Sequence, residues 1–238
     1  MTGSYRAHSA RTHVGRVRKI NEDSILLRPD IALWGVSDGM GGHAGGDFAS
    51  RTIVEALNRL PASLPPAEVM NEARTALHEA HARIKEEAVS RAQGPIGATV
   101  VLLALSERHF MCFWVGDSRL YRLRQGVLSM ISFDHSVVGE LVEQGQMTWE
   151  EAEHCNFSNQ ITRAVGVGGM LEIDKRRGEI LPGDRFLLCS DGLSQYATDA
   201  VLRKHLTDSP IETLADDLLD VALDAGAADN VSVIAVEV

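Results

Sequence analysis

The pattern of apolar and polar positions predicts a chain that mixes helices with short strands. Apolar runs of strand length lie at 32–36 and 186–189, and each is followed by Ser-Asp-Gly. After the first run, apolar residues recur at helical spacing over 47–60, so a glycine-rich loop joins the end of a buried strand to the start of a helix. A longer pattern with one apolar stripe predicts a second helix over 67–91.

The middle of the chain predicts an antiparallel sheet. Short apolar or alternating runs follow one another at hairpin spacing, and the pair Gln125-Gly126 is typical of a tight turn between two of them. Consecutive strands at this spacing pair antiparallel, which argues against a series of βαβ units. The predicted strands of this region lie at 98–105, 110–115, 120–123 and 127–131.

A polar segment over about 134–169 interrupts the strands. It contains short helical stretches, and Thr148 with Glu151 has the capping-box spacing that starts one of them. A glycine-rich stretch at 166–169 closes the segment, which we expect to be the least rigid part of the fold and to lie beside the functional site. Beyond it, the pattern predicts strands at 171–180, 186–189 and 231–238 and helices at 198–205 and 209–226.

The first part of the chain is polar and strongly charged. Residues 1–14 form an N-terminal arm without an apolar stretch. Basic residues then cluster over 16–19, directly before the acidic Glu22 and Asp23, and a short strand is predicted at 24–27. The structural interpretation of this charge pattern is a solvated hairpin edge whose charges face outward.

Length and composition favour one domain spanning 1–238. With 45% hydrophobic residues in 238 and no Pro-, Gly- or Ser-rich linker, the chain can bury one substantial core. No apolar run approaches the roughly 20 residues that cross a bilayer, and residues 1–14 carry no secretion signal, so we expect a cytoplasmic protein outside the membrane. The net charge of −10 argues against nucleic acid as a partner. Cys112, Cys155 and Cys189 are odd in number and widely spaced, which favours reduced packing residues over disulfides or a zinc site.

Four aspartates share one kind of location, where a predicted core strand meets a loop. A single aspartate there usually closes a turn by bonding to its own backbone, whereas four in one sheet-based domain indicate a shared site. Carboxylates brought that close need compensating cations. His78 and His81 are interpreted as surface or boundary residues of the second helix, so the oxygen-only ligand set favours Mg²⁺ or Mn²⁺ over zinc or copper. The four aspartates are Asp38, Asp117, Asp191 and Asp229.

Two divalent ions in such a site would suit phosphate chemistry. At roughly 3.5–4 Å from each other, they can hold a water, lower its pKa and direct it at phosphorus. A phosphate substrate also needs a positive anchor, and Arg18 offers a planar fork that matches two phosphate oxygens. Glu22 and Asp23, close behind Arg18, can hold metal-bound waters.

A series of short motifs extends this picture over almost the whole chain. In order, they are Val-Arg-Lys-Ile-Asn-Glu-Asp at 17–23, Ser-Asp-Gly-Met-Gly-Gly-His at 37–43, Gly-Ala-Thr at 97–99, Val-Gly-Asp-Ser-Arg at 115–119, Asp-His-Ser at 134–136, Ile-Thr-Arg-Ala-Val-Gly at 161–166, Ser-Asp-Gly-Leu at 190–193 and Asp-Asn at 229–230. This series resembles the PP2C-type (PPM) metal-dependent Ser/Thr protein phosphatases, and the chain is similar to a compact bacterial member.

The resemblance implies an α+β fold and a set of site residues. The fold would be a four-layer α/β/β/α sandwich, in which two antiparallel sheets are flanked by helices and a cleft at one end holds two Mn²⁺ or Mg²⁺ ions, with a third, weaker ion in bacterial members. The segment 134–169 takes the place of the family's flap, which borders the cleft and influences substrate choice. By the family pattern, Asp38 bridges both ions, the Gly39 carbonyl, Asp191 and Asp229 complete the protein ligands, Glu22 and Asp23 act through water, Asp117 helps hold the third ion and Arg18 binds the substrate phosphate.

One position departs from the animal members of the family. They carry a histidine after Asp-Gly, proposed as general acid to the leaving alkoxide, whereas Met40 stands there in this chain. Protonation of the leaving oxygen must then come from metal-bound water or from another residue. His43 is a candidate for this role, although a histidine at a helix start is commonly structural.

The predicted function is hydrolysis of phosphoserine and phosphothreonine on proteins by metal-activated water, without a phosphoenzyme. The partners would be phosphorylated targets of a cognate Ser/Thr kinase, and we expect a monomer. One alternative is a catalytically weak phosphoprotein-binding module on the same fold, and another is a small phosphate ester as substrate. A dinucleotide-binding oxidoreductase is a weaker alternative: residues 39–44 satisfy G-x-G-x-x-A, but a second helix follows where that fold needs a parallel strand.

Overall fold

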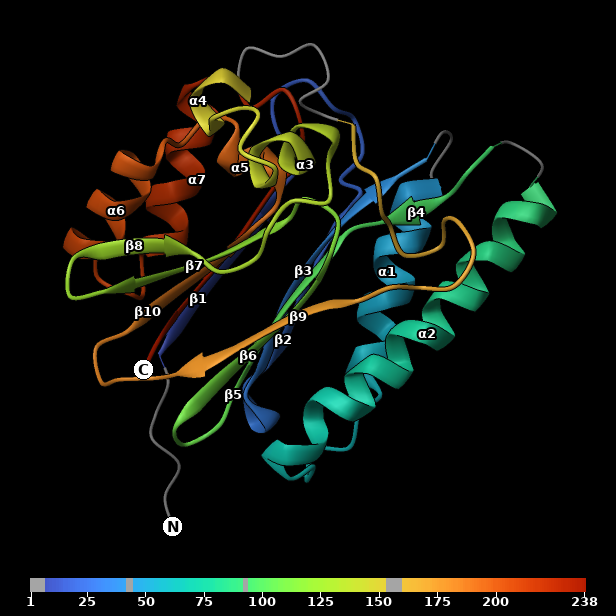
Figure 1. Cartoon of the computed structure of the whole chain (residues 1–238), viewed down its shortest axis with the longest axis horizontal. Helices are drawn as coiled ribbons and strands as arrows, with labels where there is room; N and C mark the ends of the chain where they lie inside the picture. The colour runs from blue at the N-terminus through green and yellow to red at the C-terminus, as the bar shows by residue number, and fades with distance from the viewer. Residues whose placement is uncertain (1–6, 42–44, 92–93, 153–159) are drawn as a thin grey trace.

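The computed structural model of the chain describes residues 7–41, 45–91, 94–152 and 160–238. Two antiparallel sheets lie face to face in this part of the chain (Figure 1). One sheet has the strand order β1-β11-β10-β7-β8 and the other β2-β3-β5-β6-β9, with β4 paired to β3. The strands are β1 (His8–His13), β2 (Asp23–Arg28), β3 (Leu33–Met40), β4 (Gly97–Ala98), β5 (Val100–Leu105), β6 (His109–Val115), β7 (Arg119–Arg124), β8 (Val127–Met130), β9 (Asp174–Glu179), β10 (Arg185–Cys189) and β11 (Val231–Glu237).

Helices cover the outer face of each sheet, which confirms the predicted four-layer α+β sandwich (Figure 1). The pair α1 and α2 packs on the sheet that contains β3, and α6 and α7 pack on the sheet that contains β11. In the described residues, no helix is both long and apolar enough to cross a membrane. The helices are the 3-10 turn η1 (Pro29–Ile31), α1 (Gly45–Asn58), α2 (Pro66–Arg91), α3 (Val137–Glu143), α4 (Trp149–Ala152), α5 (Asp191–Ser194), α6 (Asp199–Asp208) and α7 (Leu214–Asp224).

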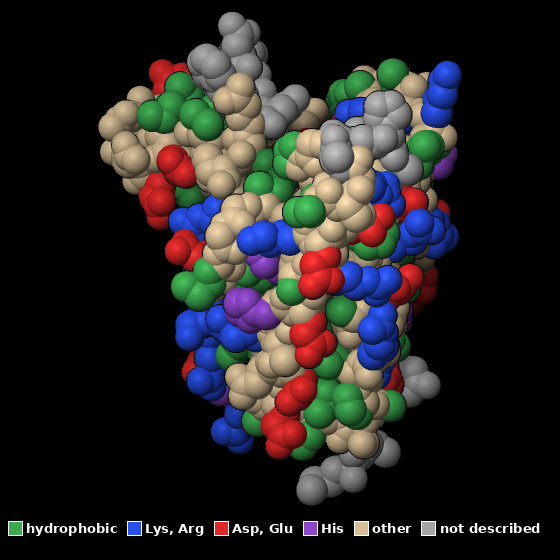
Figure 2. Space-filling view, turned by 90° about the vertical axis from the view of Figure 1, so that its right-hand side faces the viewer, with side chains coloured by type: hydrophobic (Ala, Val, Ile, Leu, Met, Phe, Trp, Pro, Cys, Tyr) green, Lys and Arg blue, Asp and Glu red, His purple; other side chains and the backbone are tan. Residues whose placement is uncertain are grey.

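The central strands are buried on both faces, which explains their continuous apolar runs. On β3, Leu33 belongs to the core beneath α1 and α2, whereas the next residue, Trp34, lies in the core between the sheets. Phe186 of β10 packs in the same inter-sheet core and is fully buried. Strands covered on both sides carry apolar residues at every position rather than at alternate ones. Outside this core, acidic and basic side chains are interleaved on the face shown in Figure 2.

Several local predictions are confirmed by the backbone. Gln125 and Gly126 adopt φ angles of 49° and 77°, the left-handed pair that a tight hairpin between β7 and β8 requires. The capping box at α4 is present, because Thr148 Oγ1 accepts from the Glu151 amide and Glu151 Oε2 accepts from the Thr148 amide. Thr198 caps α6 by accepting from the Val201 amide.

Three predictions are wrong in detail. The arm before residue 14 contains β1, which pairs with β11 at the edge of its sheet. Residues 14–22 form a loop between β1 and β2 rather than the edge of a hairpin. His81 is buried, and both of its ring nitrogens form hydrogen bonds: Nδ1 accepts from the Gly166 amide at 2.9 Å, and Nε2 bonds to the Gly169 carbonyl at 3.0 Å. His78 is exposed, as predicted. The glycine-rich stretch 166–169 is therefore tied to α2.

Candidate metal centre

The aspartates at the strand ends converge at one end of the sandwich. Asp38 lies near the end of β3, paired with Asp23 at the start of β2, and both strands belong to one sheet. Asp191 follows β10 in the other sheet, at the start of the short helix α5. Asp229 precedes β11 of that sheet, and Asp117 lies in the turn through which the chain passes from β6 in one sheet to β7 in the other. The site is thus assembled from both sheets.

Asp38 is at the electrostatic centre of this group. Burial raises its pKa well above the usual range, and the neighbouring carboxylates of Asp23, Asp191, Asp117 and Asp229 raise it further. Its backbone is fixed by Thr99, whose Oγ1 accepts from the Asp38 amide at 3.1 Å and whose own amide donates to the Asp38 carbonyl at 2.8 Å.

Asp191 and Asp117 have the same kind of environment. Burial raises the pKa of Asp191, and Asp229 is the main charge that adds to this effect. Gln195 Nε2 donates to Asp191 Oδ2 at 2.6 Å and orients the carboxylate. The pKa of Asp117 is raised well above its usual range by burial and by Asp191. Like charges that share a site disfavour their ionised forms, so this centre attracts cations.

Asp23 is the least exposed carboxylate of this centre, with 6% of its surface exposed. Ser190 Oγ donates to its Oδ2 at 2.8 Å, whereas its buried Oδ1 has no hydrogen-bond partner. Burial, together with the charges of Asp191 and Asp229, raises its pKa to about 7. A buried oxygen without a partner is costly, so a water or an ion is expected there.

Arg18 provides the positive charge at the rim. Its Nη2 lies 2.7 Å from Asp229 Oδ2, and 53% of its side chain is exposed. Asn230, which follows Asp229, holds the loop that carries Arg18. Its Nδ2 donates to the carbonyls of Val14 and Ile20, and its Oδ1 accepts from the Glu22 amide at 2.7 Å. Sequence reasoning missed this role of Asn230, although the Asp-Asn pair before a strand was a visible signal.

The glycine-rich loop allows close approach of two backbone segments. The Gly39 amide donates to the Glu22 carbonyl at 3.2 Å, and a Cβ on Gly39 would lie 2.2 Å from the Gly46 carbonyl oxygen. A Cβ on Gly46 would lie 2.7 Å from Glu22 Oε1. The end of β3, the start of α1 and Glu22 therefore pack together only with glycine at these positions. His43 lies outside the described residues.

The donors in this centre suit a hard divalent ion. They are carboxylate and carbonyl oxygens, and the partnerless oxygen of Asp23 together with the mutual repulsion of the carboxylates fits a cation. No group of three or more His, Cys, Asp or Glu side chains is close enough to hold an ion by itself in the described residues. Mg²⁺ and Mn²⁺ sites usually include carbonyl and water oxygens. The sandwich with this centre has the architecture of the PP2C-type enzymes.

Comparisons with known proteins establish the family. Residues 15–226 match the model of the protein phosphatase 2C family, and the chain belongs to this family. The serine/threonine protein phosphatase PstP of Mycobacterium tuberculosis is 34% identical over 233 residues, which cover 97% of this chain and 45% of PstP. The chain therefore spans less than half of the length of that relative. The serine/threonine phosphatase stp of Listeria monocytogenes is 32% identical over 236 residues, which cover 95% of this chain and 94% of the relative.

Solved structures agree with this assignment. PppA, a key regulatory component of T6SS in Pseudomonas aeruginosa, is 44% identical with a TM-score of 0.90, and the match covers 98% of both chains. The catalytic domain of PstP in complex with two manganese ions is 32% identical with a TM-score of 0.88, covering 98% of this chain and 97% of that one. The dinucleotide-binding alternative is wrong, because the strand pairs of the described sheets are antiparallel.

Proposed function

We propose that the chain is a metal-dependent protein phosphatase that hydrolyses phosphoserine and phosphothreonine by direct attack of water. The observation that supports this most strongly is the group of carboxylates drawn from both sheets, in which burial and neighbouring negative charge raise the pKa values of Asp38, Asp117 and Asp191. Neither of the described cysteines can act as a thiolate nucleophile. Burial raises the pKa of Cys189 to about 12 and that of Cys112 further, so both are neutral thiols.

The carboxylates are the proposed metal ligands. Two Mn²⁺ or Mg²⁺ ions would lower the pKa of a water and neutralise the charge that develops on the phosphoryl oxygens. The manganese complex of the PstP catalytic domain supports this assignment. Asp38, the Gly39 carbonyl, Asp191 and Asp229 would hold these ions, Glu22 and Asp23 would act through water, and Asp117 would help to hold a third, weaker ion.

Arg18 is the proposed anchor for the substrate phosphate. Its Nη2 is engaged by Asp229, and the remaining N–H groups of the half-exposed guanidinium can donate to two phosphate oxygens. The ion pair keeps the guanidinium beside the carboxylates without burying it. Arg18 would therefore orient the phosphorus atom toward the centre.

The proposed partners are phosphoproteins, produced by a cognate Ser/Thr kinase. We expect residues 1–238 to act as one catalytic domain, as a monomer and in the cytoplasm, with 134–169 as a flap beside the cleft. The names of the relatives support phosphoprotein substrates. The alternative function, a phosphoprotein-binding module, would use the surface around Arg18 and the carboxylates to bind phosphoproteins without hydrolysing them.

Phosphate release from a phosphothreonine peptide tests the proposal. The purified chain should release no phosphate in EDTA but should release phosphate when Mn²⁺ is added, because a cation is needed to activate the water. Peptide binding measured in parallel by fluorescence anisotropy separates the two candidates. Folded protein that binds the peptide but releases nothing with either Mn²⁺ or Mg²⁺ would favour the binding module.

Cation affinity should rise with pH. Asp23 has a pKa of about 7, and the pKa values of Asp38 and Asp191 are also raised, so a cation must displace protons below neutrality. We expect the apparent dissociation constant for Mn²⁺ to fall about tenfold per pH unit for each proton displaced, measured by isothermal titration calorimetry from pH 6 to pH 8.

The metal-free protein should show the opposite trend in stability. A carboxyl whose folded pKa is raised stabilises the fold below its unfolded pKa, and this contribution is lost as pH rises through the folded pKa of about 7. The thermal midpoint in EDTA should therefore fall from pH 5 to pH 8. A flat midpoint together with a pH-independent Mn²⁺ affinity would contradict the shared-charge account of the centre.

A further inference from the structure

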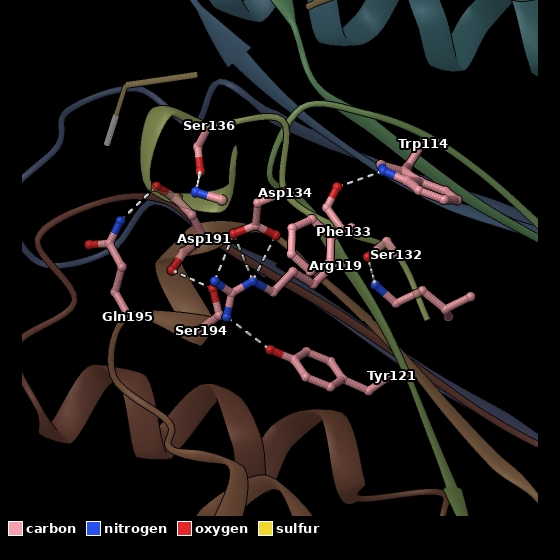
Figure 3. A network of polar contacts seen from close by, with 12 residues as sticks. Trp114, Arg119, Tyr121, Ser132, Phe133, Asp134, Ser136, Asp191, Ser194 and Gln195 are labelled. Atoms are coloured by element: carbon pink, nitrogen blue, oxygen red, sulfur yellow. Dashed lines mark hydrogen bonds and ion pairs between the residues drawn. The ribbon is translucent and has the colours of Figure 1, made fainter. Parts of the chain in front are cut away.

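Arg119 connects the candidate metal centre to the segment 134–169. It is the first residue of β7, two positions after Asp117. Its Nε and Nη2 form a bidentate ion pair with Asp134 at 2.7–3.1 Å, and its Nη1 donates to the Tyr121 hydroxyl at 3.0 Å (Figure 3). The guanidinium carbon also lies 4.9 Å from the centre of the Trp149 ring in α4. One planar group thus contacts both the start of the segment and its helix.

Further hydrogen bonds join the start of the segment to the turn that carries Asp117. The His135 amide donates to the Gly116 carbonyl at 3.0 Å, and the Gly116 amide donates to His135 Nδ1 at 3.2 Å. Phe133, whose ring lies 5.6 Å from that of Trp149, accepts a hydrogen bond at its carbonyl from Trp114 Nε1. The turn and the first residues of the segment therefore form one hydrogen-bonded unit.

The same turn is linked to the backbone of Asp38. Ser118 Oγ lies 2.7 Å from Thr99 Oγ1, which accepts from the Asp38 amide. At the other end of the segment, Val165 pairs with Ala98 of β4, and Ala98 pairs in turn with Gly39. Both ends of the segment are therefore bonded to backbone that carries the proposed ligands.

The charge of Arg119 also acts on the centre. Burial raises the pKa of Asp117 and of Asp191, and Arg119 opposes this in both cases. Figure 3 shows Asp191 close to the cluster that Arg119 forms with Asp134 and Tyr121. The Arg119 side chain is 20% exposed, so its electrostatic interactions are only weakly screened by water.

We propose that Arg119 is a positioning residue that couples the flap to the metal-binding carboxylates, with Trp149 as its contact on the flap. This inference rests on the proposed metal-dependent function. A movement of α4 changes the contact between Trp149 and the Arg119 guanidinium. The resulting shift of Arg119 moves the turn that carries Asp117, because Arg119 is two residues from Asp117 and is paired with Asp134. By reciprocity, cation binding at the carboxylates changes the environment of Trp149.

A double-mutant cycle on Mn²⁺ binding tests the coupling. Arg119→Lys keeps the charge but loses the planar fork and the stacking surface, and Trp149→Leu keeps an apolar side chain on Phe133. We expect Arg119→Lys to weaken Mn²⁺ binding about tenfold, as is usual for residues that orient ligands. The effects of the two substitutions should be non-additive by about fivefold in the apparent dissociation constant, measured by isothermal titration calorimetry.

Arg124→Lys is the matched control. Arg124 lies on the same strand and forms a bidentate pair with the buried Asp184 at 2.6–2.7 Å, but it does not contact the flap residues named above. Its cycle with Trp149→Leu should be additive within about twofold. Circular dichroism and the thermal midpoint show whether each variant is folded. If Arg119→Lys is unfolded, the effect of Trp149→Leu alone on Mn²⁺ affinity tests the coupling.

The outcomes separate the coupling from the proposed function. Wild-type protein should also change its tryptophan fluorescence when Mg²⁺ is added, and Trp149→Phe should abolish the change. Turnover that depends on Mn²⁺, with additive Arg119 and Trp149 effects, overturns the coupling and leaves the phosphatase function intact. Coupled Mn²⁺ binding without turnover overturns the function alone, and the absence of Mn²⁺ binding overturns both.

Discussion

Asp38→Asn should reduce turnover of a phosphothreonine peptide by roughly a thousandfold or more. Loss of one group that stabilises transition-state charge commonly costs about 100- to 1000-fold, and Asp38 is the proposed ligand shared by two ions. The substitution replaces a carboxylate with a neutral side chain of the same shape. The value of kcat measured with saturating Mn²⁺ is the direct readout, since it is insensitive to a moderate loss of cation affinity.

The same variant should remain folded. Burial and like charges raise the pKa of Asp38, so removal of its charge relieves repulsion in the metal-free protein. The thermal midpoint of Asp38→Asn in EDTA should therefore equal or exceed that of the wild type. Asp30→Asn is the control, because Asp30 is exposed in η1 and pairs only locally with Arg28. Wild-type kcat in Asp38→Asn would end the proposed mechanism.

The position of the acidic residues could be predicted because it depends on local sequence. Asp38 and Asp191 each follow a continuous apolar run and precede glycine, and this pattern places a carboxylate at the end of a buried strand. Four such aspartates in one sheet-based domain indicate a shared site, but the sandwich in which they converge was implied only by the resemblance to the PP2C-type phosphatases. Which of them binds an ion stays a proposal.

The supporting contacts could not be predicted because they join residues far apart in the chain. Ser190 donates to Asp23 across 167 positions, and Asn230 accepts from the Glu22 amide across 208 positions. Strand β1 was not predicted for the same reason. Its sequence, His-Ser-Ala-Arg-Thr-His, is polar, and it forms a strand because it pairs with the distant β11. Tertiary pairing overrides weak local preference at such edges.

The segment 134–169 shows a limit of composition as a guide to rigidity. The glycine-rich stretch 166–169 closes a segment expected to be the least rigid part of the fold, yet Lys85 Nζ donates to the Gly168 carbonyl at 2.7 Å, and His81 forms hydrogen bonds with both Gly166 and Gly169. A Cβ on Gly166 would lie 2.3 Å from Ile84 Cγ2, so glycine serves close packing against α2 there. Glycine in a sequence marks either freedom or close approach, and only the tertiary contacts distinguish them.

Gly192→Ala should destabilise the fold by about 2–4 kcal/mol, because a side chain at this position has no space. The added Cβ would lie 1.9 Å from the Asn230 carbonyl oxygen and 2.9 Å from its carbonyl carbon. Both are backbone atoms, so the clash cannot be relieved by turning a side chain. Either α5, which begins with Asp191, or the segment just before β11, which contains Asp229, must shift, and both aspartates are proposed ligands.

Urea unfolding followed by circular dichroism measures this effect, with Gly169→Ala as the control. Gly169 has open space around its Cβ position and no left-handed φ, so its substitution should change the midpoint little. Because the shift in Gly192→Ala separates the ligands, Mn²⁺ should stabilise this variant less than it stabilises the wild type. Wild-type stability with unchanged Mn²⁺ stabilisation would mean that the contact between α5 and Asn230 is looser than the structure shows, and the carboxylates would then not depend on it for their position.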